Sequence, residues 1–94
     1  MSNTNKKQIT VLYFAAARDA TGHSTEPIEL SILGESPNLG SLNDHLISKH
    51  PLLKPILDNC VYAINMEYID KKDVTEKQLT PGDEIAVIPP VSGG

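Results

Sequence analysis

The chain has 94 residues, of which 39% are hydrophobic and 21% charged, and its formal net charge is −4. That length suits one small domain with a single core. The basic residues are scattered, so the concentrated positive face that nucleic acid binding requires is excluded. No apolar run approaches the ~20 residues that cross a bilayer, and we expect neither a nucleic acid nor a membrane partner.

The N-terminal segment, residues 1 to 7, is polar, and we expect it to be disordered because it contributes nothing to a core. It lacks the apolar stretch and the cleavage site of an export signal. The single cysteine, Cys60, cannot form an internal disulfide. Both features favour a cytoplasmic location. Cys60 is predicted to be a buried structural thiol rather than a nucleophile.

The first predicted strand covers residues 8 to 16, QITVLYFAA, in which both alternating sets of positions are apolar. The pattern breaks at RDATGH, where Thr-Gly is a turn signal. Alternation returns in EPIELSI, with Ile28, Leu30 and Ile32 on the inward side. These two segments are predicted to form a hairpin joined by a loop.

Helical spacing follows Asn38, which is a suitable N-cap. The apolar residues at this spacing are Leu39, Leu42, Leu46 and Ile47. Pro51 is expected to end the helix at His50, because a residue before proline is disfavoured in the α region. The stretch LLKPILDN predicts one more short helical turn.

Two further strands are predicted, CVYAINMEYI and EIAVIP, separated by a charged connection and a Pro81-Gly82-Asp83 turn. The element order is therefore strand, strand, helix, strand, strand, with the helix covering one face of the sheet. The predicted core consists of Ile9, Val11, Tyr13, Ile28, Leu30, Leu42, Leu46, Ile85 and Val87.

The opposite face of the predicted sheet has no second helix to cover it. By alternation, Leu12, Phe14, Ala86 and Ile88 lie on this face. An exposed apolar patch of this kind marks a partner site. The alternative at this point is that loops cover it.

The sequence contains no pattern of catalytic or metal-binding residues. His45 and His50 are separated by about 140° on one helix, so they do not converge as zinc ligands would. The stretch GESPNLG matches neither a P-loop nor a dinucleotide fingerprint. The acidic pairs interpreted as solvated charges are Asp19/Glu26 and Asp83/Glu84. We expect no metal, no tightly bound cofactor and no catalysis by this chain alone.

Three stretches carry a resemblance to a known family: VLYFAAARDATG, AIN, and LTPGDEIAVIPPVSGG. Over about residues 8 to 94 the sequence resembles the MoaD-type sulfur carriers, which are the small subunits of molybdopterin synthases. The resemblance implies an α+β, ubiquitin-like β-grasp fold, with a mixed sheet of four to five strands packed on one main helix. The domain is then expected over residues 8 to 89, with a flexible, reactive tail over residues 90 to 94.

The resemblance also implies a function. A partner ATP-dependent enzyme adenylates the carboxylate of Gly94, and a sulfur donor converts it to a thiocarboxylate. This group gives sulfur to precursor Z (cyclic pyranopterin monophosphate) and forms the dithiolene of molybdopterin. The implied assembly is a heterotetramer of two small and two large subunits, and ATP acts only transiently, in the partner enzyme.

The composition of the tail suits this chemistry. A free carboxylate is a poor electrophile, so another protein must activate it. Residues 90 to 94 extend at most roughly 16 to 18 Å, enough to enter a buried pocket. The prolines favour extended geometry outside the sheet, and the glycines have no side chains to clash in a narrow channel. The tail residues are Pro89, Pro90, Val91, Ser92, Gly93 and Gly94.

The family's partner surface is carried over by position. Phe14 and Arg18 match an aromatic residue and an arginine at the first strand and turn. Tyr68 falls near an apolar contact position after AIN, in a segment that is longer here than in the family. Ile88 precedes Pro-Pro, where an aromatic residue is also seen, and Leu12 shares the open face with Phe14. For Arg18, an ordinary loop charge is the alternative to an interface role.

Three other functions remain open. A sulfur carrier of thiamine synthesis or tRNA thiolation has the same fold, although Pro-Pro-Val-Ser before Gly-Gly argues against both. A protein modifier would form isopeptide bonds through Gly94. An interaction domain with an inert tail would be unaffected by loss of Gly94.

Overall fold

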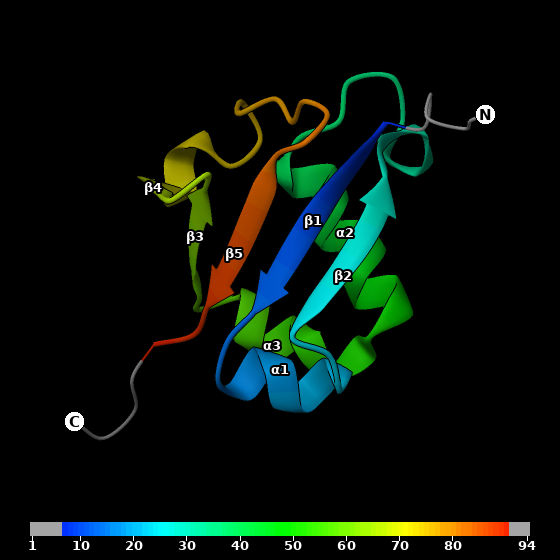
Figure 1. Cartoon of the computed structure of the whole chain (residues 1–94). Coiled ribbons are helices and arrows are strands. Elements are labelled where there is room, and N and C mark those ends of the chain that lie inside the picture. The colour runs from blue at the N-terminus through cyan, green and yellow to red at the C-terminus, as the bar shows by residue number, and fades with distance from the viewer. Residues whose placement is uncertain (1–6, 91–94) are drawn as a thin grey trace.

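The computed structural model describes residues 7 to 90, apart from the side chain of Lys71. The strands are β1 (Gln8–Tyr13), β2 (Thr25–Glu29), β3 (Val61–Ile64), β4 (Glu67–Ile69) and β5 (Glu84–Ile88). The α-helices are α1 (Ala16–Thr21), α2 (Leu39–Lys49) and α3 (Lys54–Leu57). The 3-10 turns are η1 (Leu30–Leu33), η2 (Pro51–Leu53) and η3 (Lys71–Asp73). Figure 1 shows the sheet in front of α2.

All five strands form one mixed sheet in the order β2-β1-β5-β3-β4. The central pair, β1 and β5, is parallel, with Val87 opposite Tyr13. The other three pairs are antiparallel. This is the mixed sheet on one main helix that the sequence predicts. Because β1 and β5 run in the same direction, the residues that follow each strand emerge at the same edge of the sheet.

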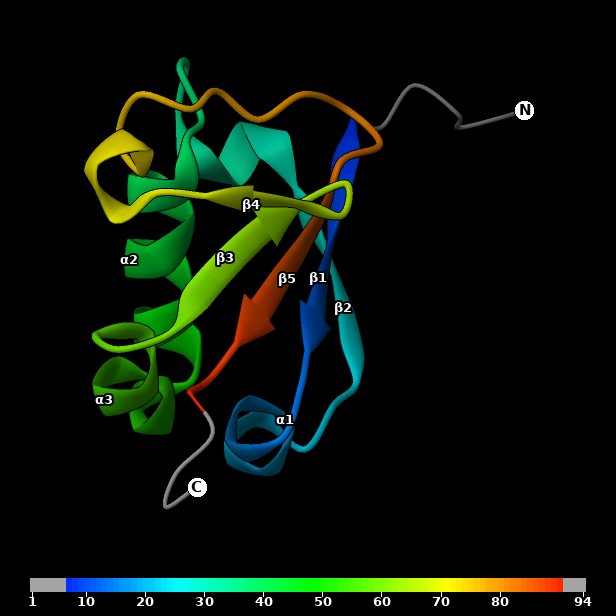
Figure 2. The ribbon, with the colours of Figure 1, turned by 90° about the vertical axis from the view of Figure 1, so that its left-hand side faces the viewer.

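The main helix, α2, packs one face of the sheet. Its inward residues Leu39, Leu42 and Leu46 are fully buried, and every other predicted core residue is buried as well. Figure 2 shows α2 and α3 on one side of the sheet and no helix on the other. The predicted core is therefore confirmed.

Both ends of α2 are as predicted. At the start, the Asn38 side chain accepts a bond of 3.0 Å from the Ser41 amide, and the Ser41 hydroxyl accepts one of 3.0 Å from the Asn38 amide. This reciprocal pair is a capping box. At the other end, His50 is the C-cap and precedes Pro51, which begins η2. The short helical segment predicted after it consists of η2 and α3.

The segment after β1 is a helix and not the predicted loop. Alanine-rich α1 has favourable helix propensity, and its buried residue Ala17 anchors it under the end of the sheet. The Ala17 amide donates to the Phe14 carbonyl at 3.0 Å. Gly22, at φ 78°, ends the helix in the left-handed region. The Thr-Gly signal thus marks a helix end instead of a hairpin turn.

The prediction that Ile32 points inward is wrong. Strand β2 ends at Glu29, and residues Leu30–Leu33 form η1. In a 3-10 turn, side chains three residues apart share a face. Leu30 and Leu33 are therefore buried together, while Ile32 is 56% exposed.

The single strand predicted over CVYAINMEYI is a hairpin of β3 and β4. Asn65 and Met66 turn the chain with φ values of 52° and 72°, as the two central residues of a type I′ turn require. The Asn65 side chain accepts a 3.0 Å bond from the Glu84 amide. Asn-Met is not the usual Asn-Gly signal, so the sequence pattern missed this turn. Cys60, just before β3, is buried as predicted.

Glu26 is buried and not solvated as predicted. Alternation from Ile28 places it on the inward face of β2, where Tyr13 Oη donates to its carboxylate at 2.8 Å. His50 Nε2 lies 3.0 Å from the same carboxylate, and Lys49 forms an ion pair with it. Burial raises the pKa of the Glu26 carboxyl, but the bonds from Lys49, Tyr13 and His50 outweigh it and lower the pKa to about 2.

The other three acidic residues predicted to be solvated differ in their burial. Asp19 and Glu84 are exposed as predicted. Asp83 is half-buried, and its carboxylate accepts 2.9 Å bonds from the Asn65 side chain and the Thr80 amide. Burial raises the pKa of the Asp83 carboxyl, but these bonds lower it below its ordinary value. They stabilise the predicted Pro81-Gly82-Asp83 turn.

Lys7 was predicted to belong to a disordered segment. Its carbonyl accepts a 2.9 Å bond from the Leu30 amide, so the ordered backbone begins before β1. Residues 1 to 6 lie outside the described part of the chain. Within residues 7 to 90, no helix is long and apolar enough to cross a membrane.

Replacing Glu26 with glutamine is expected to remove an acid-sensitive part of the stability. The folded carboxyl has a pKa of about 2 against an ordinary value of 4.5, which corresponds to roughly 3 kcal/mol of stability at neutral pH. Because the folded pKa is lowered, this contribution is present above pH 4.5 and is lost as the pH falls towards 2. Urea unfolding across that range should show the wild type converging on E26Q. A stability difference that does not change with pH would contradict this assignment.

Candidate functional site

The face of the sheet opposite α2 is apolar and uncovered. We call it the open face and define it by eight residues: Leu12, Phe14, Val61, Ala63, Met66, Tyr68, Ala86 and Ile88. Phe14 is 47% exposed, Tyr68 74% and Met66 94%. These are large apolar side chains that no loop of the described chain buries. The patch predicted from alternation is present.

Strand register arranges the open face in rows. One row crosses all five strands. Ala86 on β5 is opposite both Leu12 on β1 and Ala63 on β3. Leu12 is opposite Thr25 on β2, and Ala63 is opposite Tyr68 on β4. The two alanines are therefore flanked in this row by the large side chains of Leu12 and Tyr68.

A second row lies nearer the end of β5. Val61 on β3 is opposite Ile88. The Phe14 amide donates to the Val87 carbonyl at 3.4 Å, so Phe14 lies beside the last residues of β5. At the other end of β5, Glu84 and Thr10 are register partners, and the surface becomes polar.

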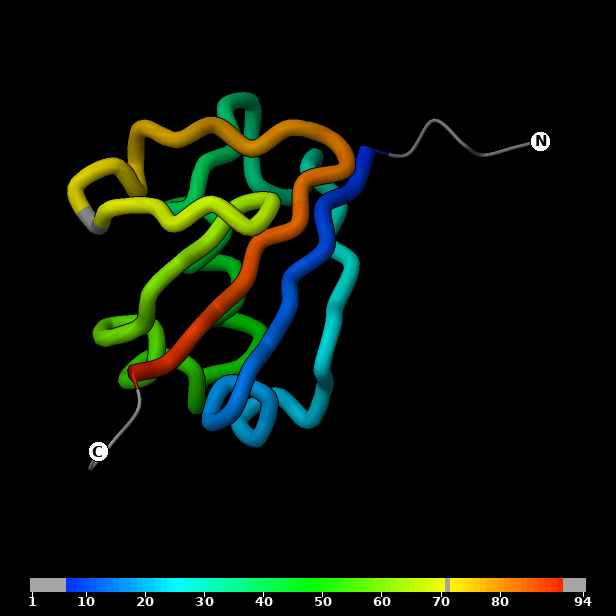
Figure 3. The backbone as a smooth tube through the Cα atoms, turned by 60° about the vertical axis from the view of Figure 1, so that its left-hand side comes forward, coloured from blue at the N-terminus to red at the C-terminus, as the bar shows by residue number. Residues whose placement is uncertain are grey.

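The predicted tail leaves the sheet next to this second row. Strand β5 ends at Ile88, which is half-buried, and Pro89 and Pro90 follow it outside the sheet. Figure 3 shows β5 running between β1 and β3 towards the end of the molecule at which α1 lies. The predicted tail residues Val91, Ser92, Gly93 and Gly94 lie outside the described residues.

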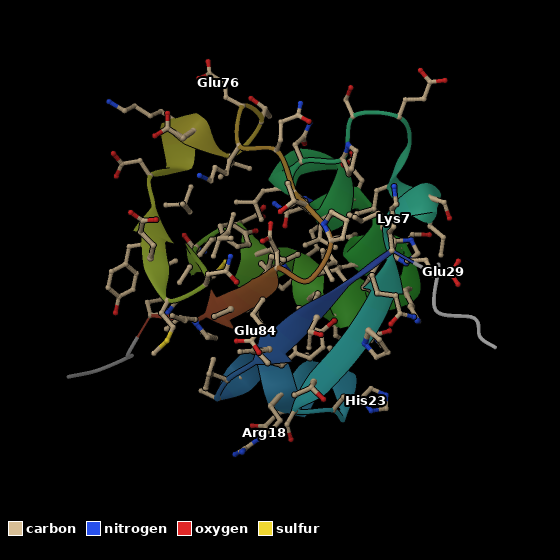
Figure 4. The ribbon with its side chains drawn as sticks, turned by 45° about the horizontal axis from the view of Figure 1, so that its top comes forward. Lys7, Arg18, His23, Glu29, Glu76 and Glu84 are labelled. Carbon is tan, nitrogen blue, oxygen red and sulfur yellow. The ribbon has the colours of Figure 1, made fainter. Side chains whose placement is uncertain are left out.

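Arg18 lies on α1 rather than in a loop, and its side chain is exposed. Figure 4 shows Arg18 and His23 at the α1 end of the molecule. Because α1 follows β1 directly, Arg18 is held at the edge where β5 also ends. It can present a positive charge beside the exit of the tail.

The structure brings four of the five predicted interface residues onto the open face, namely Leu12, Phe14, Tyr68 and Ile88, and places Arg18 at its edge. Sequence reasoning missed Val61, Ala63 and Met66. The side of the sheet on which these three residues lie can be predicted only if β3 and β4 are recognised as a hairpin. The Asn-Met turn that joins the two strands is not a strong sequence signal for a hairpin. Among the described residues, no group of three or more histidine, cysteine or acidic side chains is placed to hold a metal ion.

The parallel central pair, the single covering helix and the antiparallel flanking strands make this a β-grasp fold of the ubiquitin-like class. The chain matches the ThiS family model over residues 11–94 and belongs to that family.

Similar proteins support this assignment. The chain is 40% identical over 87 residues to the molybdopterin synthase sulfur carrier subunit of Chlamydomonas reinhardtii, covering 93% of this chain and 99% of the relative. It is 27% identical to small archaeal modifier protein 1 from Methanosarcina acetivorans, with a TM-score of 0.75 over 96% of this chain and 99% of that one. A chain in the complex of subunits 1 and 2 of the molybdopterin-converting factor from Helicobacter pylori is 25% identical, with a TM-score of 0.63 over 93% of this chain and 99% of that one. The predicted fold is confirmed by these likenesses.

The open face is expected to contribute little to folding stability. Phe14 is 47% exposed while Leu42 is fully buried. Phe14→Ala should therefore cost less than about 1 kcal/mol, whereas Leu42→Ala should cost about 2 to 5 kcal/mol. Guanidinium unfolding of both variants measures this difference. Equal losses would show that Phe14 belongs to the core.

Proposed function

We propose that this chain is the sulfur carrier subunit of a molybdopterin synthase and that Gly94 carries the sulfur as a thiocarboxylate. The observation that carries the proposal is the meeting of two features at one edge of the sheet: an uncovered apolar face and the exit of the Pro-Pro segment. The name and coverage of the Chlamydomonas reinhardtii relative support this pathway.

The proposed chemistry takes place in partner enzymes. In the first, an oxygen of the Gly94 carboxylate attacks the α-phosphorus of ATP, and pyrophosphate leaves. A donor of hydrosulfide-level sulfur then attacks the acyl carbon and expels AMP, leaving a thiocarboxylate. In the large subunit of the synthase, the thiocarboxylate sulfur bonds to a carbon of precursor Z and displaces an oxygen substituent there. Water then hydrolyses the acyl–sulfur bond, which leaves the sulfur on the precursor and regenerates the Gly94 carboxylate. The part played by this chain is delivery, which brings the reacting group into another protein's site in a suitable geometry.

The fold makes delivery reproducible. Strand β5 pairs with β1 on one side and with β3 on the other, so Ile88 is a fixed point of attachment. Pro89 and Pro90 restrict the backbone that follows. From Pro90, residues 90 to 94 reach at most roughly 16 to 18 Å. Any enzyme that takes Gly94 must therefore lie against this edge of the carrier.

The partner surface follows from that restriction. Leu12, Phe14, Tyr68 and Ile88 are proposed to make its apolar contacts, and Arg18 its charged contact. The structural relative from Helicobacter pylori was solved as a complex of subunits 1 and 2, which supports a large-subunit partner for this chain. A heterotetramer of two small and two large subunits, an ATP-dependent activating enzyme and a cytosolic location are parts of the same proposal.

The activating enzyme and the large subunit are proposed to use overlapping surfaces, because both must receive the same short tail. Binding of one should then exclude the other. Size-exclusion chromatography with light scattering on a mixture of all three proteins tests this expectation. A ternary complex that contains a single carrier would contradict it.

A second function is favoured by one observation. The likeness to small archaeal modifier protein 1 keeps a protein modifier as the alternative, since such a protein would use the same adenylate. It would form isopeptide bonds with lysines, and a search for covalent adducts after activation would separate the two functions. A thiamine or tRNA sulfur carrier would form the same thiocarboxylate but pass its sulfur to a different acceptor.

The mass of the C-terminal tryptic peptide tests the proposal. Lys77 is the last basic residue, so trypsin releases residues 78 to 94, a peptide without methionine or cysteine. Incubation with the activating enzyme, ATP and sulfur donor should raise its mass by the replacement of one oxygen by sulfur. Omission of ATP is the control. An unchanged mass, in a mixture that sulfurates another carrier, would contradict the proposal.

Phe14→Asp is expected to weaken binding to the large subunit at least tenfold, about 1.4 kcal/mol or more, because a charge would be buried at the interface. Isothermal titration calorimetry measures the dissociation constant. Ile32→Asp is the matched control, since Ile32 is also an exposed large apolar residue, at 56%, and lies on η1 away from the open face. If F14D and I32D bind as tightly as wild type, the proposed interface is wrong.

A further inference from the structure

The centre of the open face is hollow. Ala63 and Ala86 face each other across β3 and β5 and are 5% and 9% exposed. We call the hollow above them the alanine socket. Its volume is about 410 Å³. The side chains that surround the two alanines are Leu12, Phe14, Met66, Tyr68, Glu84 and Ile88.

The socket exists because its floor is small while its walls are large. Leu12 and Tyr68 flank the two alanines in their row. Phe14 and Met66, both strongly exposed, extend the walls. A larger residue in place of either alanine would fill the space directly, because successive side chains of a strand alternate between faces and these two point away from the core.

The side chains that line the socket favour an apolar group over a polar one. Apart from the Glu84 carboxylate and the Tyr68 hydroxyl, the lining is hydrocarbon, thioether and aromatic ring. A polar group placed above the two alanines would lose its water, and their methyl groups offer it no hydrogen bond. A large apolar side chain would instead bury the exposed walls and contact the two alanines.

The length of the tail limits the proteins that can supply this side chain to those that bind Gly94. Ile88 is both a wall of the socket and the last residue of β5. Residues 89 to 94 span at most roughly 20 Å, so an enzyme that holds Gly94 must also approach Ile88. That enzyme is therefore placed to cover the socket.

We propose that the alanine socket receives one large apolar side chain, of the size of Phe, Leu or Met, from the large subunit that takes Gly94. This inference rests on the proposed function. It adds the part of the large subunit that the carrier recognises, namely one apolar side chain. A buried apolar anchor near the centre of an interface is the usual form of a binding hot spot.

Filling the socket tests the proposal. Ala86→Val and Ala63→Val place branched side chains on the floor, where strands accept them well. Each is expected to raise the dissociation constant for the large subunit about tenfold or more, although each adds apolar surface. Far-UV circular dichroism and thermal unfolding verify that the variants fold. Ser31→Val is the matched control: Ser31 is exposed on η1, away from the open face, so this change adds a branched apolar side chain outside the socket and should change the constant less than twofold.

A measurement on the wild type covers the case in which a variant does not fold. In alanine-methyl NMR, addition of the large subunit should shift or broaden the signals of Ala63 and Ala86, while the signal of Ala17, which is fully buried in the core, stays in place. Unchanged signals of Ala63 and Ala86 in the bound state would overturn the socket.

The outcomes separate the two proposals. If A86V and A63V bind like wild type while Phe14→Asp weakens binding, the socket is wrong and the interface stands. If Phe14→Asp also binds like wild type, the proposed interface is wrong and the socket with it. If the wild type does not bind the large subunit, the proposed function fails.

Discussion

The parallel pairing of β1 with β5 decides where every functional part of this molecule lies. The Thr10 amide donates to the Asp83 carbonyl at 2.9 Å at one end of the pair, and the Phe14 amide reaches the Val87 carbonyl at the other. Since both strands run in one direction, the segments that follow them emerge together. One carries Phe14 and Arg18, and the other carries Ile88 and the two prolines. An antiparallel pair would separate these segments by the length of the sheet.

The same topology leaves one face of the sheet exposed. Helix α2 buries Leu39, Leu42 and Leu46 against one face, and no helix within residues 7 to 90 covers the opposite face. An uncovered apolar surface promotes association, and the register confines it to the end where β5 finishes. Glu26, held by Tyr13, His50 and Lys49, joins β1, β2 and the end of α2 beneath that edge. A firm support of this kind keeps the position of Phe14 defined without a covering layer.

The features that depend on local sequence pattern could mostly be predicted from the sequence. The leucines after Asn38 have a helical period, and both the helix and its capping residue follow from that. The inward residues of β1 and β5 follow from alternation. Other features depend on the register of the whole sheet. Glu26 looks solvated because it is charged, yet its place two residues before Ile28 turns it inward. Ile32 continues an alternating pattern, but the chain has already entered η1. Ala63 and Met66 belong to the open face only because Asn65 reverses the chain.

The proposed role of the tail follows from the resemblance of its sequence to a family. The fold explains why the tail leaves the sheet next to the open face. The sequence Pro-Pro-Val-Ser-Gly-Gly indicates the sulfur-carrier reaction. The parallel pairing of β1 with β5 explains why the tail leaves the sheet beside Phe14. The molecule therefore has two functional parts, a reactive end at Gly94 and an open face that binds the partner enzyme. These two parts should fail independently when each is altered.

A chain that lacks only Gly94 tests this division most directly. Its dissociation constant for the large subunit and its acceptance of sulfur from the activating enzyme would be measured on the same preparation. The account predicts binding within a few-fold of wild type, because the open face is intact, and no sulfur transfer at all. Retained sulfur transfer would contradict the assignment of the reaction to Gly94.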